Sequence, residues 1–138
     1  MEYKILEEKD IDLMKDFIDD ENTKYEEENL IKFINDNHSY GFIANIENKI
    51  IGFSYGYTLL RTEGKQYFYL HAIDIMAKYQ GSGYGTQLMD YIREYTKQIG
   101  CRKMFLITNK SNISACRCYE KAGGVSDADD DIVYAYKF

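Results

Sequence analysis

Proline and tryptophan are absent from this 138-residue sequence, which also contains only three cysteines and two histidines. The cysteines, Cys101, Cys116 and Cys118, are odd in number and lack a secretory context, so we expect reduced thiols rather than disulfides. No second Cys or His pair matches the spacing of Cys116 and Cys118, which argues against a metal site. No apolar run approaches the roughly 20 residues that span a bilayer. The N-terminal stretch MEYKILEEKD is too charged for a signal peptide, so we expect a cytoplasmic protein without membrane contact.

The composition is that of a globular chain, with 45% hydrophobic and 29% charged residues. At 138 residues the chain is long enough to bury a core and too short for two ordinary domains. It contains no internal repeat and no linker-like stretch. We therefore expect residues 1–138 to form a single domain.

The net charge of −6 is distributed unevenly. Residues 1–40 carry thirteen acids and five bases, whereas residues 71–121 carry eight bases and four acids. The acidic half argues against nucleic acid as a partner and favours a cationic one, while the basic half favours an anion. Solvated helix faces explain the N-terminal acids equally well, so charge alone leaves both interpretations open.

Hydrophobic periodicity predicts a mixed α+β (α/β) fold with elements in the order βααβββαβαβ. Strands are expected at residues 3–7, at 41–60 as a pair around a turn at 47–49, and at 65–76, 103–108 and 131–138. Helices are expected after Asp10, which can cap the first, around residues 30–34, at 84–99 before Gly100, and at 112–123. The apolar positions of the first helix are Ile11, Met14, Phe17 and Ile18.

The stretch YQGSGYGTQL, residues 79–88, places three glycines at alternate positions between a strand and a helix. The first N–H groups of a helix have no intrahelical partner, and they favour an anion by roughly 0.3–1 kcal/mol when exposed. Glycine at positions 81, 83 and 85 permits a left-handed backbone and a close approach of phosphate. Thr86 breaks the dinucleotide-binding pattern, and no Gly-Lys-Ser/Thr of an ATPase loop follows. We therefore expect a phosphate-bearing ligand of another kind.

Two motifs carry a resemblance to the GNAT superfamily of N-acetyltransferases. The residues Gln80 to Gly85 resemble the family's Q/R-x-x-G-x-G/A loop, which grips the pyrophosphate of acetyl-CoA. The residues Asn112 to Gly124 are similar to the family pattern N-x-x-A-x-x-x-Y-x-K-x-G-F, with Gly124 in place of Phe. The resemblance covers essentially the whole chain. It implies a mixed central sheet with helices on both faces and a splay between the strands at 67–76 and 103–108.

The resemblance also implies acetyl-CoA as the co-substrate and no metal. The strand backbone near residues 73–76 holds the pantetheine arm and the acetyl carbonyl in this family, and the glycine loop holds the pyrophosphate. The implied cofactor-binding residues are Ile73, Ile75, Met76, Gln80, Gly81, Ser82, Gly83, Tyr84, Gly85, Thr86, Asn112, Ala115 and Tyr119.

Two residues are candidates for proton transfer. Tyr119 matches the tyrosine that the family often uses to protonate the departing sulfur. A phenol of pKa about 10 facing a thiol of pKa about 8.5 would assist departure rather than be required for it. His71 aligns where many relatives carry a glutamate, and an imidazole of pKa about 6.5 can accept a proton at neutral pH. A purely structural role in the strand is equally compatible with His71.

Acidic residues near both candidate motifs could bind the acceptor amine. Asp74, Asp129 and Asp130 are candidate acceptor-binding residues, and Asp127 and Asp131 extend the acidic cluster, although a solvated turn also explains that cluster. The stretches FIDDENTKYEEENLIKFIND and YFYLHAIDIMAKYQGSGYG are similar to the aminoglycoside 3-N-acetyltransferase branch. This implies a small cationic acceptor. A polyamine, a peptide amine and an acyl-CoA sensor without turnover stay open as alternatives, as does a homodimer.

Overall fold

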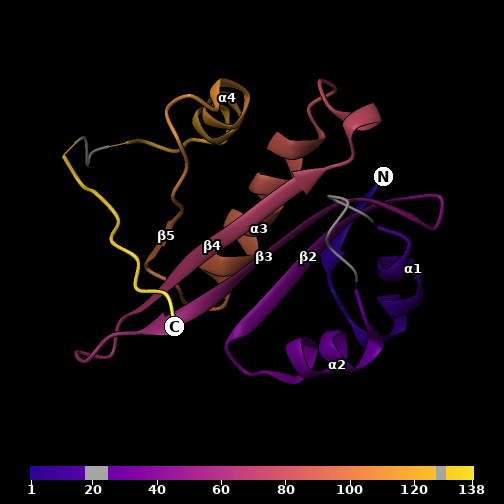
Figure 1. The fold of residues 1–138 in the computed structure, drawn as a ribbon, viewed down its shortest axis with the longest axis horizontal. Coiled ribbons are helices and arrows are strands. Elements are labelled where there is room, and N and C mark those ends of the chain that lie inside the picture. Colours follow the sequence, from indigo (N-terminus) through magenta and orange to yellow (C-terminus); the bar gives the residue numbers. More distant parts are fainter. Residues whose placement is uncertain (18–24, 127–129) are drawn as a thin grey trace.

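The computed structural model describes residues 1–17, 25–126 and 130–138. Five strands form one sheet in the order β1-β2-β3-β4-β5 (Figure 1). The strands are β1 (Glu2–Ile5), β2 (Ser39–Ile46), β3 (Lys49–Leu60), β4 (Gln66–Ile75) and β5 (Lys103–Phe105). The pairs β1–β2, β2–β3 and β3–β4 are antiparallel, whereas β5 pairs with β4 in parallel. The expected mixed sheet is thereby confirmed.

Helices cover both faces of the sheet. They are α1 (Ile11–Lys15), α2 (Glu27–Asn35), α3 (Tyr84–Gln98) and α4 (Ile113–Lys121), with short 3-10 turns η1 (Glu8–Asp10) and η2 (Ala77–Tyr79). Side chains alternate across a strand. In β2, Ile43 therefore packs into the core under α1 and α2, while Phe42 packs into the core under α3. Both are fully buried, which is worth about 1.5–3 kcal/mol for each side chain. In the described part of the chain no helix is long and apolar enough to cross a bilayer.

The predicted turns are confirmed by backbone geometry. Glu47 and Asn48 have φ of 48° and 62°, the left-handed conformation of a two-residue hairpin turn whose twist matches the strands that it joins. Gly100, with φ of 94°, follows the end of α3 as expected.

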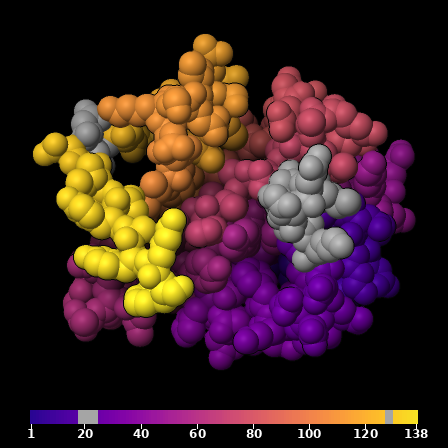
Figure 2. Space-filling model, in the orientation of Figure 1, coloured from indigo at the N-terminus to yellow at the C-terminus, as the bar shows by residue number. Residues whose placement is uncertain are grey.

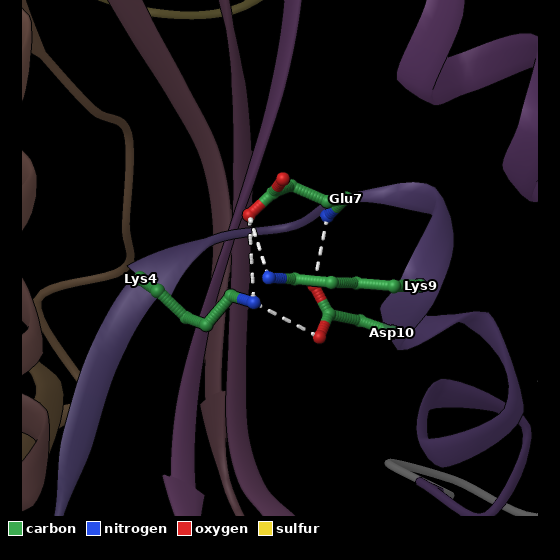
Figure 3. Close-up of polar contacts among 4 residues, drawn as sticks. All are labelled: Lys4, Glu7, Lys9 and Asp10. Carbon is green, nitrogen blue, oxygen red and sulfur yellow. Dashed lines mark hydrogen bonds and ion pairs between the residues drawn. The ribbon is translucent and has the colours of Figure 1, made fainter.

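The prediction that the Asp10 side chain caps the first helix is wrong. It makes no capping hydrogen bond to that helix; its Oδ2 accepts from the Glu7 N–H at 2.9 Å and its Oδ1 from Lys4 Nζ at 3.0 Å (Figure 3). The end of β1 brings Lys4 beside the η1 turn, so the carboxylate is engaged by an ammonium that sequence spacing does not reveal. Burial alone lowers the pKa of Lys4, but the hydrogen bond and charge of Asp10, together with Glu7, raise it above its usual value.

Two expected strands differ from the structure. Strand β5 ends at Phe105 rather than at residue 108, and residues 131–138 form no strand although their sequence favours one. That C-terminal segment lies exposed along the surface, drawn in yellow in Figure 2. Strand β5 at the edge of the sheet is only three residues long, so it offers few backbone hydrogen-bond partners to another strand. A segment with high strand propensity forms no strand unless its N–H and C=O groups can pair with a neighbouring strand. Of the predicted apolar positions of the first helix, Ile11, Met14 and Phe17 are buried, and Ile18 lies outside the described residues.

Candidate active site

The glycine loop connects the end of β4, through η2, to the start of α3. Gly81 and Gly83 have φ of 82° and 88°, the left-handed conformation that the sequence predicted for them. Gly83 directly precedes Tyr84, the first residue of α3. A methyl group at Gly81 would meet nothing within 4 Å, and at Gly83 only Gln87 Nε2 at 4.0 Å. The loop therefore leaves open space beside the first N–H groups of a four-turn helix, which fits an approaching phosphate.

The loop is tied to β4 by Gln80. Its Nε2 donates to the carbonyl oxygen of Ile75 at 2.8 Å, while the Met76 N–H donates to the Ile51 carbonyl at 2.8 Å. The side chain of Gln80 thus has a structural partner within the chain. Ser82 is exposed on the loop.

The prediction of a left-handed backbone at all three glycines is wrong for Gly85. Its φ is not positive, and it belongs to α3. A methyl group there would lie 3.3 Å from Cys118 Sγ and 3.7 Å from Ile75 Cγ1. Thr86 Oγ1 also contacts Cys118 Sγ at 3.8 Å. Gly85 is therefore small because α4 packs against the first turn of α3.

The second motif forms α4 and its two ends. Asn112 caps the helix, because its Oδ1 accepts from the Ala115 N–H at 3.3 Å. At the other end, the Gly124 N–H donates to the Tyr119 carbonyl at 2.8 Å, in the pattern of a Schellman motif. A methyl group at Gly124 would lie 2.9 Å from that same oxygen, which explains a glycine in this structure at the position where the family pattern has Phe.

The predicted splay is present between β4 and the chain that follows β5. The two strands pair only through Tyr67–Lys103, Phe68–Met104 and Tyr69–Phe105, after which β4 continues to Ile75. A small pocket opens where they part. Its lining residues are Leu70, His71, Ala72, Ile73, Leu106, Ile107 and Tyr119. The splay therefore brings His71 and Tyr119, which lie on different elements, to one pocket.

A β-bulge determines how His71 is presented. Tyr55 pairs with Ala72 and Gly56 pairs with Leu70, so His71 is an extra residue of β4 opposite that pair. The bulge shifts the alternation of the strand: Leu70 packs into the core under α3, and so does Ile73 three residues later. His71 itself is exposed.

Three tyrosines that the sequence analysis missed surround His71. The centroids of the Tyr55, Tyr57 and Tyr69 rings lie 5.2, 6.3 and 5.5 Å from the centroid of its imidazole. We call these four residues the tyrosine cluster. The alternation of aromatic residues at 53, 55 and 57 and at 67 and 69 is a signal that could have placed them on one face.

Tyr119 is half-buried on α4. Burial raises the pKa of its phenol above the usual value, and the neighbouring Cys118, Asp74 and Cys116 raise it further. The phenol is therefore held protonated at neutral pH. A protonated hydroxyl on the wall of the pocket has the form required of a proton donor.

Neither of the two predicted acceptor-binding acids that the structure describes, Asp74 and Asp130, lines the pocket at the splay. Asp74 is exposed on β4, close enough to Tyr119 to act on its pKa. Asp130 and Asp131 are exposed in the C-terminal segment and do not line the pocket. Asp127 and Asp129 lie outside the described residues. Among the residues that the structure describes, no cluster of His, Cys, Asp and Glu could hold a metal ion.

A larger hollow, of about 230 Å³, lies between the end of β1, the end of α2 and the start of β2. Its lining includes Leu6, Ile34, Asp36 and Tyr40, and none of the predicted site residues. The Asp36 carboxylate there accepts from the Ser39 hydroxyl at 2.7 Å and from the His38 N–H at 3.0 Å. These local bonds lower the pKa of Asp36 and serve the turn into β2.

Comparisons with known proteins agree with this geometry. The profile of the Acetyltransferase (GNAT) family matches residues 10–124. No curated protein sequence matches the chain significantly. Among solved structures, an aminoglycoside acetyltransferase from an uncultured soil metagenomic sample, in complex with sisomicin, has a TM-score of 0.82 at 22% identity, covering 99% of this chain and 95% of that one.

Two further solved structures have the same fold. Ribosomal-protein-alanine N-acetyltransferase from Brucella melitensis biovar Abortus 2308 has a TM-score of 0.79 at 15% identity, with 100% of both chains covered. Aminoglycoside N-acetyltransferase AAC(6')-Iy, in complex with CoA, has a TM-score of 0.75 at 15% identity, covering 99% of this chain and 100% of that one.

Proposed function

The chain belongs to the GNAT family of acetyltransferases, and we propose that it moves an acetyl group from acetyl-CoA to the primary amine of a small cationic acceptor. The observation that carries this proposal is the pocket at the splay. It has His71 and Tyr119 on its walls and lies beside the strand that leads into the glycine loop. A proton acceptor and a proton donor are thus available at one place.

The residues that would hold acetyl-CoA fit its chemistry. The N–H groups of residues 81–86 would receive the pyrophosphate, because left-handed glycines and a helix N-terminus favour an anion there. The backbone edge of residues 73–76, beyond the last pair with β5, would bind the pantetheine amides. Asn112 and Ala115 would contribute by positioning α4.

The proton steps follow from the two side chains on the pocket. Acetyl-CoA supplies an activated thioester. Neutral His71 would remove a proton from the acceptor ammonium, and the freed amine would form the new C–N bond at the acetyl carbonyl carbon as the C–S bond breaks. Tyr119 would donate its proton to the departing sulfur, and the nitrogen, which still carries two hydrogens after the C–N bond forms, would lose one of them to solvent as the amide forms. The imidazolium would return its proton to the Tyr119 phenolate through solvent, so that each turnover releases one proton. The products are the N-acetylated amine and the free thiol of CoA.

Two observations support a cationic acceptor. Aminoglycoside acetyltransferases among the structural neighbours favour an aminoglycoside, and the thirteen acids of residues 1–40 favour a cation. A protein acetyltransferase is the second candidate, because the ribosomal-protein-alanine N-acetyltransferase has the same fold and the acids of residues 1–40 would also suit a basic peptide. Asp74, Asp129 and Asp130 are kept as candidate acceptor-binding residues.

A thiol-release assay tests the proposal. Purified protein would be incubated with acetyl-CoA and, separately, an aminoglycoside, a polyamine, an arylalkylamine and a basic peptide. We expect amine-dependent CoA release with at least one amine, and saturable acetyl-CoA binding by calorimetry. Binding without release in any arm would favour a sensor, and the absence of binding would refute the proposal.

A further inference from the structure

We infer that the tyrosine cluster is the acceptor subsite and that it selects a monoamine carrying an aromatic ring. This rests on the proposed function and names the acceptor class at the same pocket. The cluster occupies β3 and β4 on the face of the sheet that α2 covers, since Phe33 of α2 lies 5.9 Å from Tyr55 and 6.5 Å from Tyr57, centroid to centroid.

The cluster is continuous with the pocket at the splay. His71 belongs to both, because it lines the pocket and contacts all three tyrosine rings. On the side of β5, Phe105 lies 5.3 Å from Tyr69 and extends the row of rings to the point where the strands part. An amine whose nitrogen lies beside His71 would therefore place its substituent against aromatic side chains.

The chemistry of these side chains favours one kind of substituent. Tyrosine faces carry negative charge density that attracts an ammonium, and their edges pack against another aromatic ring. The residues that line the pocket and form the cluster include no carboxylate, and among the described acids only Asp74 acts on the pocket's Tyr119. A polyamine or aminoglycoside with several ammonium groups would find one aromatic site and no matching set of acids there. One ammonium attached to one ring matches the cluster.

The first experiment measures binding without turnover. The chain has only two histidines, so two imidazole Cε1–H signals are expected in its proton NMR spectrum, and the His38→Gln variant identifies that of His71. His38 Nδ1 lies 3.2 Å from Thr58 Oγ1, and Thr58 follows Tyr57 in β3, so that its side chain points to the opposite face of the sheet. We expect 2-phenylethylamine to move the His71 signal saturably and to leave the His38 signal in place. Hexylamine and spermidine should compete at least about threefold less well. An unmoved His71 signal, or equal competition by spermidine, overturns the inference.

The second experiment uses kcat/KM with acetyl-CoA. We expect 2-phenylethylamine to exceed hexylamine, and Tyr57→Leu and Tyr69→Leu each to reduce that ratio about two- to tenfold, whereas Tyr57→Phe keeps it. Tyr67→Leu is the matched control, because Tyr67 contacts the side chains of Arg61 and Lys103 instead. Turnover of an aminoglycoside with no preference for the aryl amine would overturn the inference and leave the proposed function intact. If acetyl-CoA fails to bind, the proposed function is refuted. The NMR titration would then still show whether the tyrosine cluster binds an aromatic amine.

Discussion

Gly85 in the first turn of α3 faces Cys118 in α4 so closely that a methyl group on Gly85 would lie 3.3 Å from the sulfur. This contact joins the helix that begins at the glycine loop to the helix that carries Tyr119. The distance is tighter than ordinary van der Waals contact, so the neighbouring helix would have to move slightly to admit a side chain.

Because of this contact, we expect Gly85→Ala to have opposite effects on stability in the wild type and in the Cys118→Ala variant. In the wild type, Gly85→Ala should lower the free energy of unfolding by about 1 kcal/mol, because overpacking outweighs the gain in helix propensity. In the Cys118→Ala background the same change should be neutral or stabilising by up to about 1 kcal/mol. Urea denaturation of the four proteins measures the coupling. Equal effects in both backgrounds would show that the two residues do not constrain each other.

Gly83 and Gly64 form a matched pair for the phosphate loop. Their φ angles are 88° and 93°, and neither has an atom closer than 4.0 Å to the position of a methyl group. Each change to Ala should therefore cost about 1 kcal/mol of stability through backbone strain. Only Gly83→Ala should weaken acetyl-CoA binding. We expect its affinity to fall about tenfold or more, which corresponds to the loss of one hydrogen bond to phosphate. Calorimetry measures both affinities, and identical affinities would remove the loop from the binding site.

Tyr119→Phe tests the proton donor. We expect kcat to fall by roughly ten- to a hundredfold with little change in the KM for acetyl-CoA, since the ring stays in place and only the hydroxyl is lost. The exposed Tyr134→Phe is the control. Steady-state and single-turnover rates should be compared, because an unchanged single-turnover rate would return Tyr119 to a packing role.

The pH dependence of stability offers a separate test of Tyr119. Burial raises the pKa of the folded phenol, so the unfolded chain loses the proton first as the pH rises. The contribution of this group to stability should be fully present below the unfolded pKa of about 10 and decline above it. Tyr119→Phe should remove that part of the alkaline loss, which thermal unfolding between neutral and alkaline pH can measure.

His71→Ala should depress kcat/KM at neutral pH and remove an ionisation from its acidic limb, because only neutral imidazole accepts a proton. His38→Ala, at the other histidine, should leave the profile unchanged. A pH profile of kcat/KM over the acidic and neutral range distinguishes the two. If the acidic limb survives in His71→Ala, another group or an ordered water is the base.

Asp10→Ala should destabilise the fold by about 3 kcal/mol, because it leaves the Lys4 ammonium partly buried beside one exposed partner, Glu7. The side chain of Asp10 is 7% exposed and that of Lys4 17%. Asp12→Ala is the matched control, since its side chain is 95% exposed and should change stability by less than about 0.5 kcal/mol. Denaturant unfolding measures both. A small effect of Asp10→Ala would mean that water replaces the carboxylate.

Local patterns were sufficient for much of the fold and for the glycine loop. The left-handed Gly81 and Gly83, the hairpin turn at Glu47 and Asn48, and the helix ended by Gly100 follow from residues close together in the chain. Each depends on backbone conformations that few residue types adopt, so the amino acids by themselves indicate them. The family motifs likewise indicated a phosphate loop and placed Tyr119 on a helix.

Features that depend on partners far apart in the sequence were decided by the tertiary structure. The segment 131–138 has the pattern of a strand but no ladder, Asp10 is engaged by Lys4, and Gly85 is small because of Cys118. The bulge that exposes His71 arises from the register of β4 on β3, and the splay then brings that imidazole to the same pocket as Tyr119. The sequence by itself determined which conformations each short segment prefers. Which side chains meet was determined only when strands and helices packed, because register and close packing depend on contacts between segments distant in the chain.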